Sequence, residues 1–103
     1  MKYKILQLQD IQKVKYAFMD YDFAKKHKFK LADYKVVYEG EVPLDLNNRK
    51  IKEVFLILDS LFTTFNVHRP KDFVGHSLSV SDLIQLDNDI YYVDSVGFQK
   101  VDA

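Results

Sequence analysis

The densest set of residues capable of chemistry lies in one short stretch of the chain. Residues 69–82 hold one arginine, one histidine, three serines and two aspartates. Serine, histidine and carboxylate are the groups of a nucleophilic hydrolase. The candidate triad is drawn from Ser77 or Ser79, His76, and Asp82 or Asp94. No Gly-x-Ser-x-Gly elbow or Gly-rich oxyanion loop accompanies them. An uncharacterised hydrolase is therefore the last of three hypotheses, and no catalytic residue is predicted.

The residue types and their spacing do not indicate a metal or cofactor site. The chain has no cysteine, which excludes a thiolate zinc site and a cysteine nucleophile. His68 and His76 are eight residues apart rather than at the i, i+4 spacing of a helical zinc pair. His27 stands in a run of lysines, where positive charge opposes a second cation. Three scattered glycines make no phosphate loop, so we predict no metal and no cofactor.

A lysine patch gives the second hypothesis, a nucleic-acid-binding accessory factor. Its members are Lys25, Lys26, Lys28 and Lys30. Lysines of this spacing track a phosphate backbone, and the interleaved rings of Phe23, Phe29 and Tyr34 would stack on bases. The isoelectric point near 6.8 and the shortness of the patch argue for a solvated helix end instead.

Composition predicts a single domain over residues 1–103. At 48% hydrophobic and 15% aromatic, the chain can bury a core without disulfides. The net charge is zero, but residues 1–35 carry nine Lys against four Asp, whereas residues 71–103 carry two Lys against six Asp. Opposite ends of this kind either attract each other within one fold, or they permit head-to-tail association as a homodimer or a polarised surface for another partner. With no apolar signal core and no run able to cross a bilayer, we expect a cytoplasmic protein without a membrane partner.

The helices and strands that position these residues are predicted from the periodicity of apolar residues and from turn residues. Charge order favours a helix over 20–28, with acid at its start and base at its end. An apolar stripe predicts the main helix at about 48–65, with Phe55 on the stripe and Ile57 off it, ended by Pro70. Extended segments are predicted at 3–8, 14–19, 34–42, 90–93 and 97–101. Residues 77–82 are left open between a helical turn and an extended piece.

These elements predict an α+β fold. A small antiparallel sheet of about four or five strands is packed by the one main helix, with a C-terminal hairpin around 87–89. Val36 and Tyr38 are expected on one face of their strand and Val37 on the other. Tyr91 and Tyr92 face opposite ways in a regular strand, so one of them is available on the outer face to a partner or a crossing loop.

Four segments carry a resemblance to a known family, the YodL-like domains of Gram-positive bacteria. The segments are Tyr16-Ala-Phe-Met-Asp-Tyr-Asp, Tyr34-Lys-Val-Val-Tyr-Glu-Gly-Glu, Asn66-Val-His-Arg-Pro-Lys-Asp-Phe-Val-Gly-His-Ser-Leu-Ser-Val-Ser-Asp and Tyr91-Tyr-Val-Asp-Ser-Val-Gly-Phe. The resemblance spans nearly the whole chain and brings no catalytic residues with it. It implies a setting in phages, plasmids and conjugative elements, often beside counter-defence modules.

The leading hypothesis follows from that setting. The protein is expected to be a non-enzymatic protein-binding module that inhibits a host defence protein such as a CRISPR effector nuclease, with acidic residues imitating DNA phosphates. The predicted partner-binding residues lie in the 69–82 loop and around the hairpin: Arg69, Phe73, Asp82, Asp87, Asp89, Tyr92 and Asp94.

Overall fold

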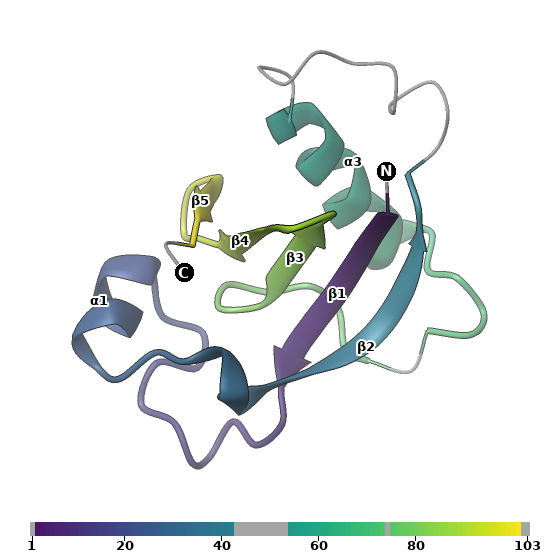
Figure 1. Cartoon of the computed structure of the whole chain (residues 1–103). Helices are drawn as coiled ribbons and strands as arrows, with labels where there is room; N and C mark the ends of the chain where they lie inside the picture. Colours follow the sequence, from purple (N-terminus) through teal and green to yellow (C-terminus); the bar gives the residue numbers. More distant parts are fainter. Residues whose placement is uncertain (1, 43–53, 74, 102–103) are drawn as a thin grey trace.

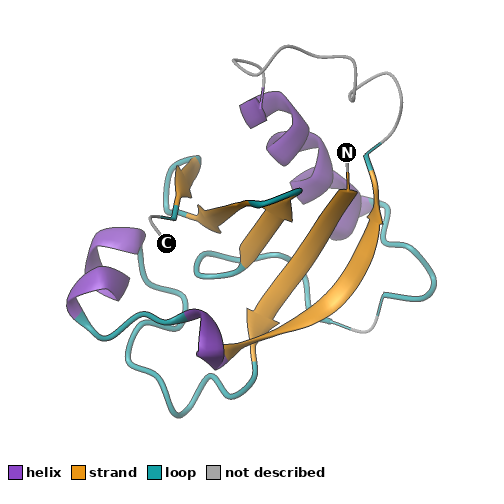
Figure 2. Cartoon of the chain, viewed as in Figure 1, coloured by secondary structure: helices purple, strands orange, loops and turns teal. Residues whose placement is uncertain are grey.

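A five-stranded antiparallel sheet organises the chain, with helices on both of its faces (Figures 1 and 2). The computed structural model describes residues 2–42, 54–73 and 75–101. The strand order across the sheet is β2-β1-β3-β4-β5. The elements in chain order are β1 (Lys2–Leu8), α1 (Tyr21–Lys26), a 3-10 turn (Leu31–Asp33), β2 (Tyr34–Glu41), α3 (Val54–Val67), β3 (Leu83–Leu86), β4 (Asp89–Val93) and β5 (Phe98–Lys100).

The predicted α+β class, the strand count and the hairpin are confirmed. β3 and β4 pair in antiparallel register with Leu86 opposite Asp89, so Asp87 and Asn88 form the turn. Helix α1 begins where charge order predicted, and the Asp20 carboxylate caps it by accepting the Phe23 N–H at 2.8 Å. The prediction of an extended piece at 14–19 is wrong. That segment is an irregular loop in which Phe18 has a φ of 64°.

Helix α3 packs against one face of the sheet through a stripe that differs from the predicted one. Ile57, Leu58, Leu61 and Phe65 are buried, whereas Phe55 is 53% exposed. Ile57 therefore belongs to the buried side and Phe55 does not, because the position of the sheet decides which helical face is covered. The predicted helix start at about 48 lies outside the described residues, and the helix continues to Val67.

Successive side chains of a strand point to opposite faces of the sheet, and a hydrophobic core lies on each face. In β4, Tyr91 and Val93 point to the α3 side, and Tyr92 points to the α1 side. The core on the α3 side comprises Tyr3, Ile5, Val42, Ile57, Leu58, Leu61, Phe65, Phe73, Leu78, Ile84, Leu86, Tyr91, Val93 and Phe98. The core on the α1 side comprises Leu8, Tyr16, Tyr21, Ala24, Tyr34, Leu83, Tyr92 and Val101. A second core explains how the chain accommodates seven tyrosines and eight phenylalanines.

A β-bulge in β2 overturns the predicted distribution of its side chains. The register with β1 pairs Ile5 with Tyr38 and Leu6 with Val36, so Val37 is the extra residue. Val37 and Tyr38 consequently both pack against the core on the α3 side, while Val36 is 47% exposed. Within the described residues, no helix is long and apolar enough to cross a membrane.

Candidate functional site

A buried polar cluster joins β1 to the segment that contained the candidate hydrolase residues. The Gln7 side chain, only 2% exposed, donates from Nε2 to the His76 carbonyl at 2.8 Å and to Asp82 Oδ2 at 3.2 Å. His76 Nδ1 lies 3.9 Å from the same carboxylate oxygen. Asp82 is itself 2% exposed, and the His76 side chain is 46% exposed. The cluster therefore has a buried amide and carboxylate with a histidine at its solvent edge.

The Nδ1 atom of His76 has one acceptor and one donor beside it. The Ser77 carbonyl lies 2.7 Å from Nδ1, and Gln7 Nε2 lies 3.2 Å from it. A hydrogen on Nδ1 serves the Ser77 carbonyl, whereas a lone pair on Nδ1 serves the Gln7 amide, so these contacts fit either tautomer of the neutral ring.

Burial dominates the acidity of Asp82. Desolvation raises the pKa of its carboxyl from 3.8 to about 6, against the lowering effects of the Ser79 N–H, the His76 charge and the Gln7 amide. The carboxylate oxygen Oδ2 accepts from Ser79 N at 2.9 Å, and Asp82 N donates to the Ser79 carbonyl at 3.0 Å. These two bonds close a turn, so 77–82 is neither helix nor extended strand.

The cluster does not assemble a nucleophile and its base. Ser79 Oγ donates to the Ser77 carbonyl at 3.2 Å, and Ser77 Oγ accepts from Arg69. Among the residues that the structure describes, no serine hydroxyl is hydrogen-bonded to the His76 ring. The residues of the candidate triad thus act here as partners of backbone groups, which is the usual role of short hydroxyl side chains in turns.

Gln7 is the member of the cluster that the sequence reading missed. It follows Tyr3 and Ile5 at alternate positions of β1, where a third apolar residue is the norm. Its neighbour Gly75 is required for space, because a Cβ there would overlap Gln7 Oε1. The sequence did contain a signal for the cluster, because a polar residue at an inward-facing strand position indicates a buried hydrogen-bonding partner.

Three of the predicted partner-binding residues are interior, and that part of the prediction needs correction. Phe73 packs in the α3-side core, Asp82 belongs to the buried cluster, and Tyr92 is fully buried. Tyr92 is covered because the chain from Val14 to Tyr34 crosses the outer face of the sheet. Their side chains are not available to a partner in this fold.

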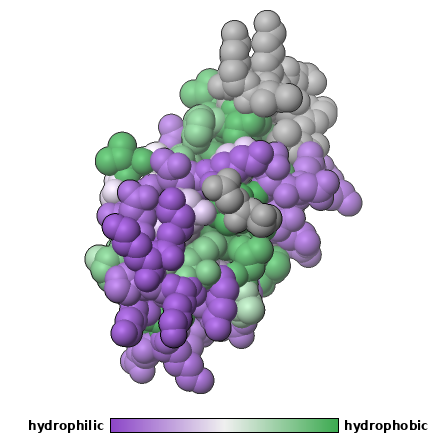
Figure 3. Space-filling view, turned by 60° about the vertical axis from the view of Figure 1, so that its left-hand side comes forward, coloured by the Kyte–Doolittle hydropathy of each residue, from purple (hydrophilic) through white to green (hydrophobic). Residues whose placement is uncertain are grey.

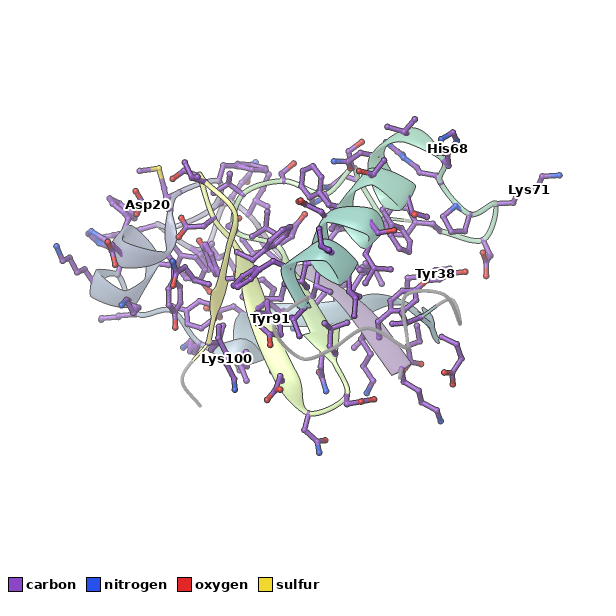
Figure 4. The ribbon with its side chains drawn as sticks, turned by 90° about the horizontal axis from the view of Figure 1, so that it is seen from above. Asp20, Tyr38, His68, Lys71, Tyr91 and Lys100 are labelled. Atoms are coloured by element: carbon purple, nitrogen blue, oxygen red, sulfur yellow. The ribbon has the colours of Figure 1, made fainter. Side chains whose placement is uncertain are left out.

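The remaining four predicted contacts are at least partly accessible but do not form one surface. Asp87 Oδ1 accepts from Lys2 N at 3.0 Å, and Asp89 lies 3.4 Å from Lys100 Nζ. Asp94 stands at the other end of β4, about 17 Å from Asp89 at the usual rise per residue. Its Oδ1 accepts from Tyr21 N at 3.2 Å. Arg69 follows the end of α3, and His68 and Lys71 on either side of it in the sequence lie far from Asp20 in Figure 4. The acidic residues thus have local partners and do not make a continuous acidic face.

A rigid loop before α1 presents two large apolar side chains that the sequence reading did not single out. Phe18 is 52% exposed and Met19 is 39% exposed. The Phe18 N–H donates to Ser81 Oγ at 2.9 Å, and the Met19 carbonyl accepts from the Tyr92 hydroxyl at 2.6 Å. Burial raises the pKa of the Tyr92 phenol, which keeps this donor protonated. Buried groups therefore fix the backbone of both residues while their side chains face solvent.

The lysine patch gains two members from a distant segment. Lys26, Lys28 and Lys30 line a groove together with Lys13 and Lys15 of the loop before α1. Lys25 faces elsewhere, 3.6 Å from Asp22 and over the Tyr21 ring. The predicted stacking rings are not free: Tyr34 is buried, and Phe29 packs against the core on the α1 side. Figure 3 shows the face turned toward the viewer as largely hydrophilic, with separate hydrophobic areas.

Comparison with known proteins identifies one relationship. The model of the YodL-like domain family matches residues 2–103. The comparison with curated proteins and the comparison with solved structures gave no match.

Proposed function

The chain belongs to the YodL-like domain family, and from that premise we propose that it is a non-enzymatic protein-binding module whose contact surface centres on Phe18 and Met19. The resemblance implies a setting in mobile elements. That setting supports a specific role for the binding module, the inhibition of a host defence protein such as a CRISPR effector nuclease. The single observation that carries the proposal is the backbone of Phe18, held at a φ of 64° with its ring half exposed.

Left-handed backbone is unfavourable for a bulky residue and persists only when the surroundings impose it. Ser81 and Tyr92 impose it here through their hydrogen bonds to Phe18 and Met19. A further bond, from Met19 N to the Tyr16 carbonyl at 3.0 Å, fixes the same loop. Because the backbone is already fixed, an aromatic and a thioether side chain displayed from it bind without a further cost in backbone entropy, which favours an interface hot spot.

The surroundings of this loop define the chemistry of the partner. The His76 ring lies 6.4 Å from the Phe18 ring, centroid to centroid. The exposed Asp20 follows directly, and the half-buried Asp94 is tied to the start of α1. An apolar centre with an acidic rim fits a protein that offers an apolar pocket bordered by basic side chains.

The test begins with affinity capture from the bacterial host and identification of the captured protein by mass spectrometry. The purified partner is then titrated against the wild type, F18S/M19S and the control F55S/L56S. Phe55 and Leu56 are 53% and 51% exposed on α3, so the control removes two comparable apolar side chains from another surface. We expect F18S/M19S to weaken binding roughly 30-fold, the effect of losing one hot spot, and F55S/L56S to leave it unchanged.

Two outcomes would reject parts of the proposal. If F18S/M19S binds the partner as tightly as the wild type does, the Phe18–Met19 surface is not the contact surface. If D87K/D89K alone weakens binding, the contact surface is the β3–β4 hairpin. If the captured protein is a nuclease whose cleavage of DNA is unchanged by saturating wild-type protein, the inhibitory role is excluded while the binding role stands.

A further inference from the structure

A basic groove between the loop before α1 and the segment after α1 is a second candidate binding site. Its volume is about 290 Å³, and its lining includes Lys13, Lys15, Lys26, His27, Lys28 and Lys30. We propose that this groove binds the phosphate backbone of a nucleic acid. The proposal is independent of the Phe18–Met19 surface.

The walls of the groove are held together by the fold. The Tyr16 hydroxyl donates to Asp33 Oδ2 at 2.8 Å, which joins the two segments at the floor. Gln9 adds a second link, since its N–H donates to the Asp33 carbonyl at 2.9 Å and its Nε2 donates to the Tyr34 carbonyl at 3.1 Å. The lysines of the two segments therefore face a common space in the folded chain.

The lining of the groove keeps a net positive charge in the described part of the chain. Among the described residues, none of its five ammonium groups lies within ion-pair distance of a carboxylate. Asp33, the one acid in the lining, accepts the Tyr16 hydroxyl and remains an anion, so five lysines and one aspartate leave a formal charge of +4. Unpaired like charges around one groove repel each other, and a bound polyanion removes that repulsion.

Helix chemistry explains only part of this lysine set. Lys25 and Lys26 stand in the last turn of α1, where cations are favoured by the helix dipole. Lys28 instead occupies the left-handed position after the helix, with a φ of 66°, and Phe29 N donates to the Ala24 carbonyl at 3.0 Å. This is the position at which helix ends favour glycine. A lysine there costs backbone strain that glycine would not, and it adds a cation to the groove that Lys13 and Lys15 also line.

The lining also indicates which part of a nucleic acid is recognised. Five flexible ammonium groups match a series of phosphates better than one phosphate, and they provide no fork for reading base edges. Tyr16 lies in the lining but is 1% exposed, so its ring is not available for base stacking. We therefore infer contact with the backbone without sequence preference.

Fluorescence anisotropy with a labelled 20-nucleotide single strand tests the proposal. If all five lysines contact phosphates, the affinity falls about 100-fold between 50 and 200 mM salt. K13Q/K15Q should reduce the slope of log affinity against log salt by about 1.4, the contribution of two contacts. The matched control, K2Q/K71Q, removes two exposed lysines that lie outside the groove and should leave the slope unchanged.

Three results would overturn the proposal. The first is no binding to the single strand or to the matching duplex at 50 mM salt. The second is equal loss of affinity in K13Q/K15Q and K2Q/K71Q, which would show a general charge effect. The third is lysine-dependent binding to poly-glutamate or to anionic vesicles with none to nucleic acid. F18S/M19S should bind the strand like the wild type, which separates this site from the protein-binding surface.

Discussion

Replacement of Asp82 by asparagine should remove a large pH dependence of stability. The introduced amide keeps the two hydrogen bonds of the cluster, because its carbonyl oxygen can replace Oδ2 as the acceptor from Ser79 N and Gln7 Nε2. The D82N protein differs from the wild type mainly in having no proton to lose at this position. The difference in free energy of unfolding between the two proteins therefore isolates the titration of this carboxyl.

The sign and the size of this pH dependence of stability follow from the raised pKa of Asp82. Below pH 3.8 the carboxyl is protonated in both folded and unfolded chains and contributes nothing. Between pH 3.8 and about 6 the unfolded chain ionises while the folded chain stays protonated, so stability falls as pH rises. The full loss corresponds to about 3 kcal/mol and is complete slightly above pH 6.

Urea unfolding followed by far-ultraviolet circular dichroism at pH 4, 5, 6 and 7 measures the effect. The free energy of unfolding of the wild type minus that of D82N should fall by about 2 kcal/mol across this range, because part of the full loss has already occurred at pH 4. In a H76Q background the fall should extend to higher pH, because the His76 charge lowers the pKa of Asp82. A difference that is constant within about 0.5 kcal/mol, or that rises with pH, would refute the burial argument.

Three further substitutions test packing and backbone strain by the same unfolding measurement. K28G should raise the free energy of unfolding by about 1 kcal/mol, because glycine removes the strain at a φ of 66°, while weakening binding to the labelled strand. G75A should lower it by about 1–3 kcal/mol, because its Cβ would overlap the Gln7 side chain. F65A should lower it by about 3–5 kcal/mol, because the Phe65 ring is fully buried against Tyr38 and Phe73.

The sequence predicted those parts of the fold that depend on neighbouring residues. The strand at β1, the capped start of α1 and the hairpin between β3 and β4 all follow from alternation, capping and turn residues within about ten positions. The bulge at Val37 and the buried side of α3 were not predictable in this way. They are set by the register with β1 and by the position of the sheet, which are contacts between distant segments.

The same distinction explains the fate of the predicted sites. Asp82 and Tyr92 were read as surface residues because nothing nearby in the chain covers them. Asp82 is covered by β1 through Gln7, and Tyr92 is covered by the segment that follows β1. The sequence identified only the lysines of one wall of the groove. Lys13 and Lys15 are brought to Lys26, Lys28 and Lys30 by contacts of Tyr16 and Gln9 with Phe29 and residues 32–34.

Four non-glycine residues have a positive φ in the described chain, and their surroundings divide them into two kinds. Ser81 is buried, and its N–H, hydroxyl and carbonyl are bonded to Val93, Phe18 and Tyr34. Asp87 forms the hairpin turn and bonds to β1 through its N–H and carboxylate.

Phe18 and Lys28 differ from this pair, because each has an exposed side chain at a position where glycine would remove the strain. Neither side chain is buried, so burial does not offset the strain at these positions. The two residues lie on the two surfaces that we propose for binding, one apolar and one basic. If K28G and F18G both stabilise the fold and each weakens only its own binding reaction, strain at these positions is explained by function.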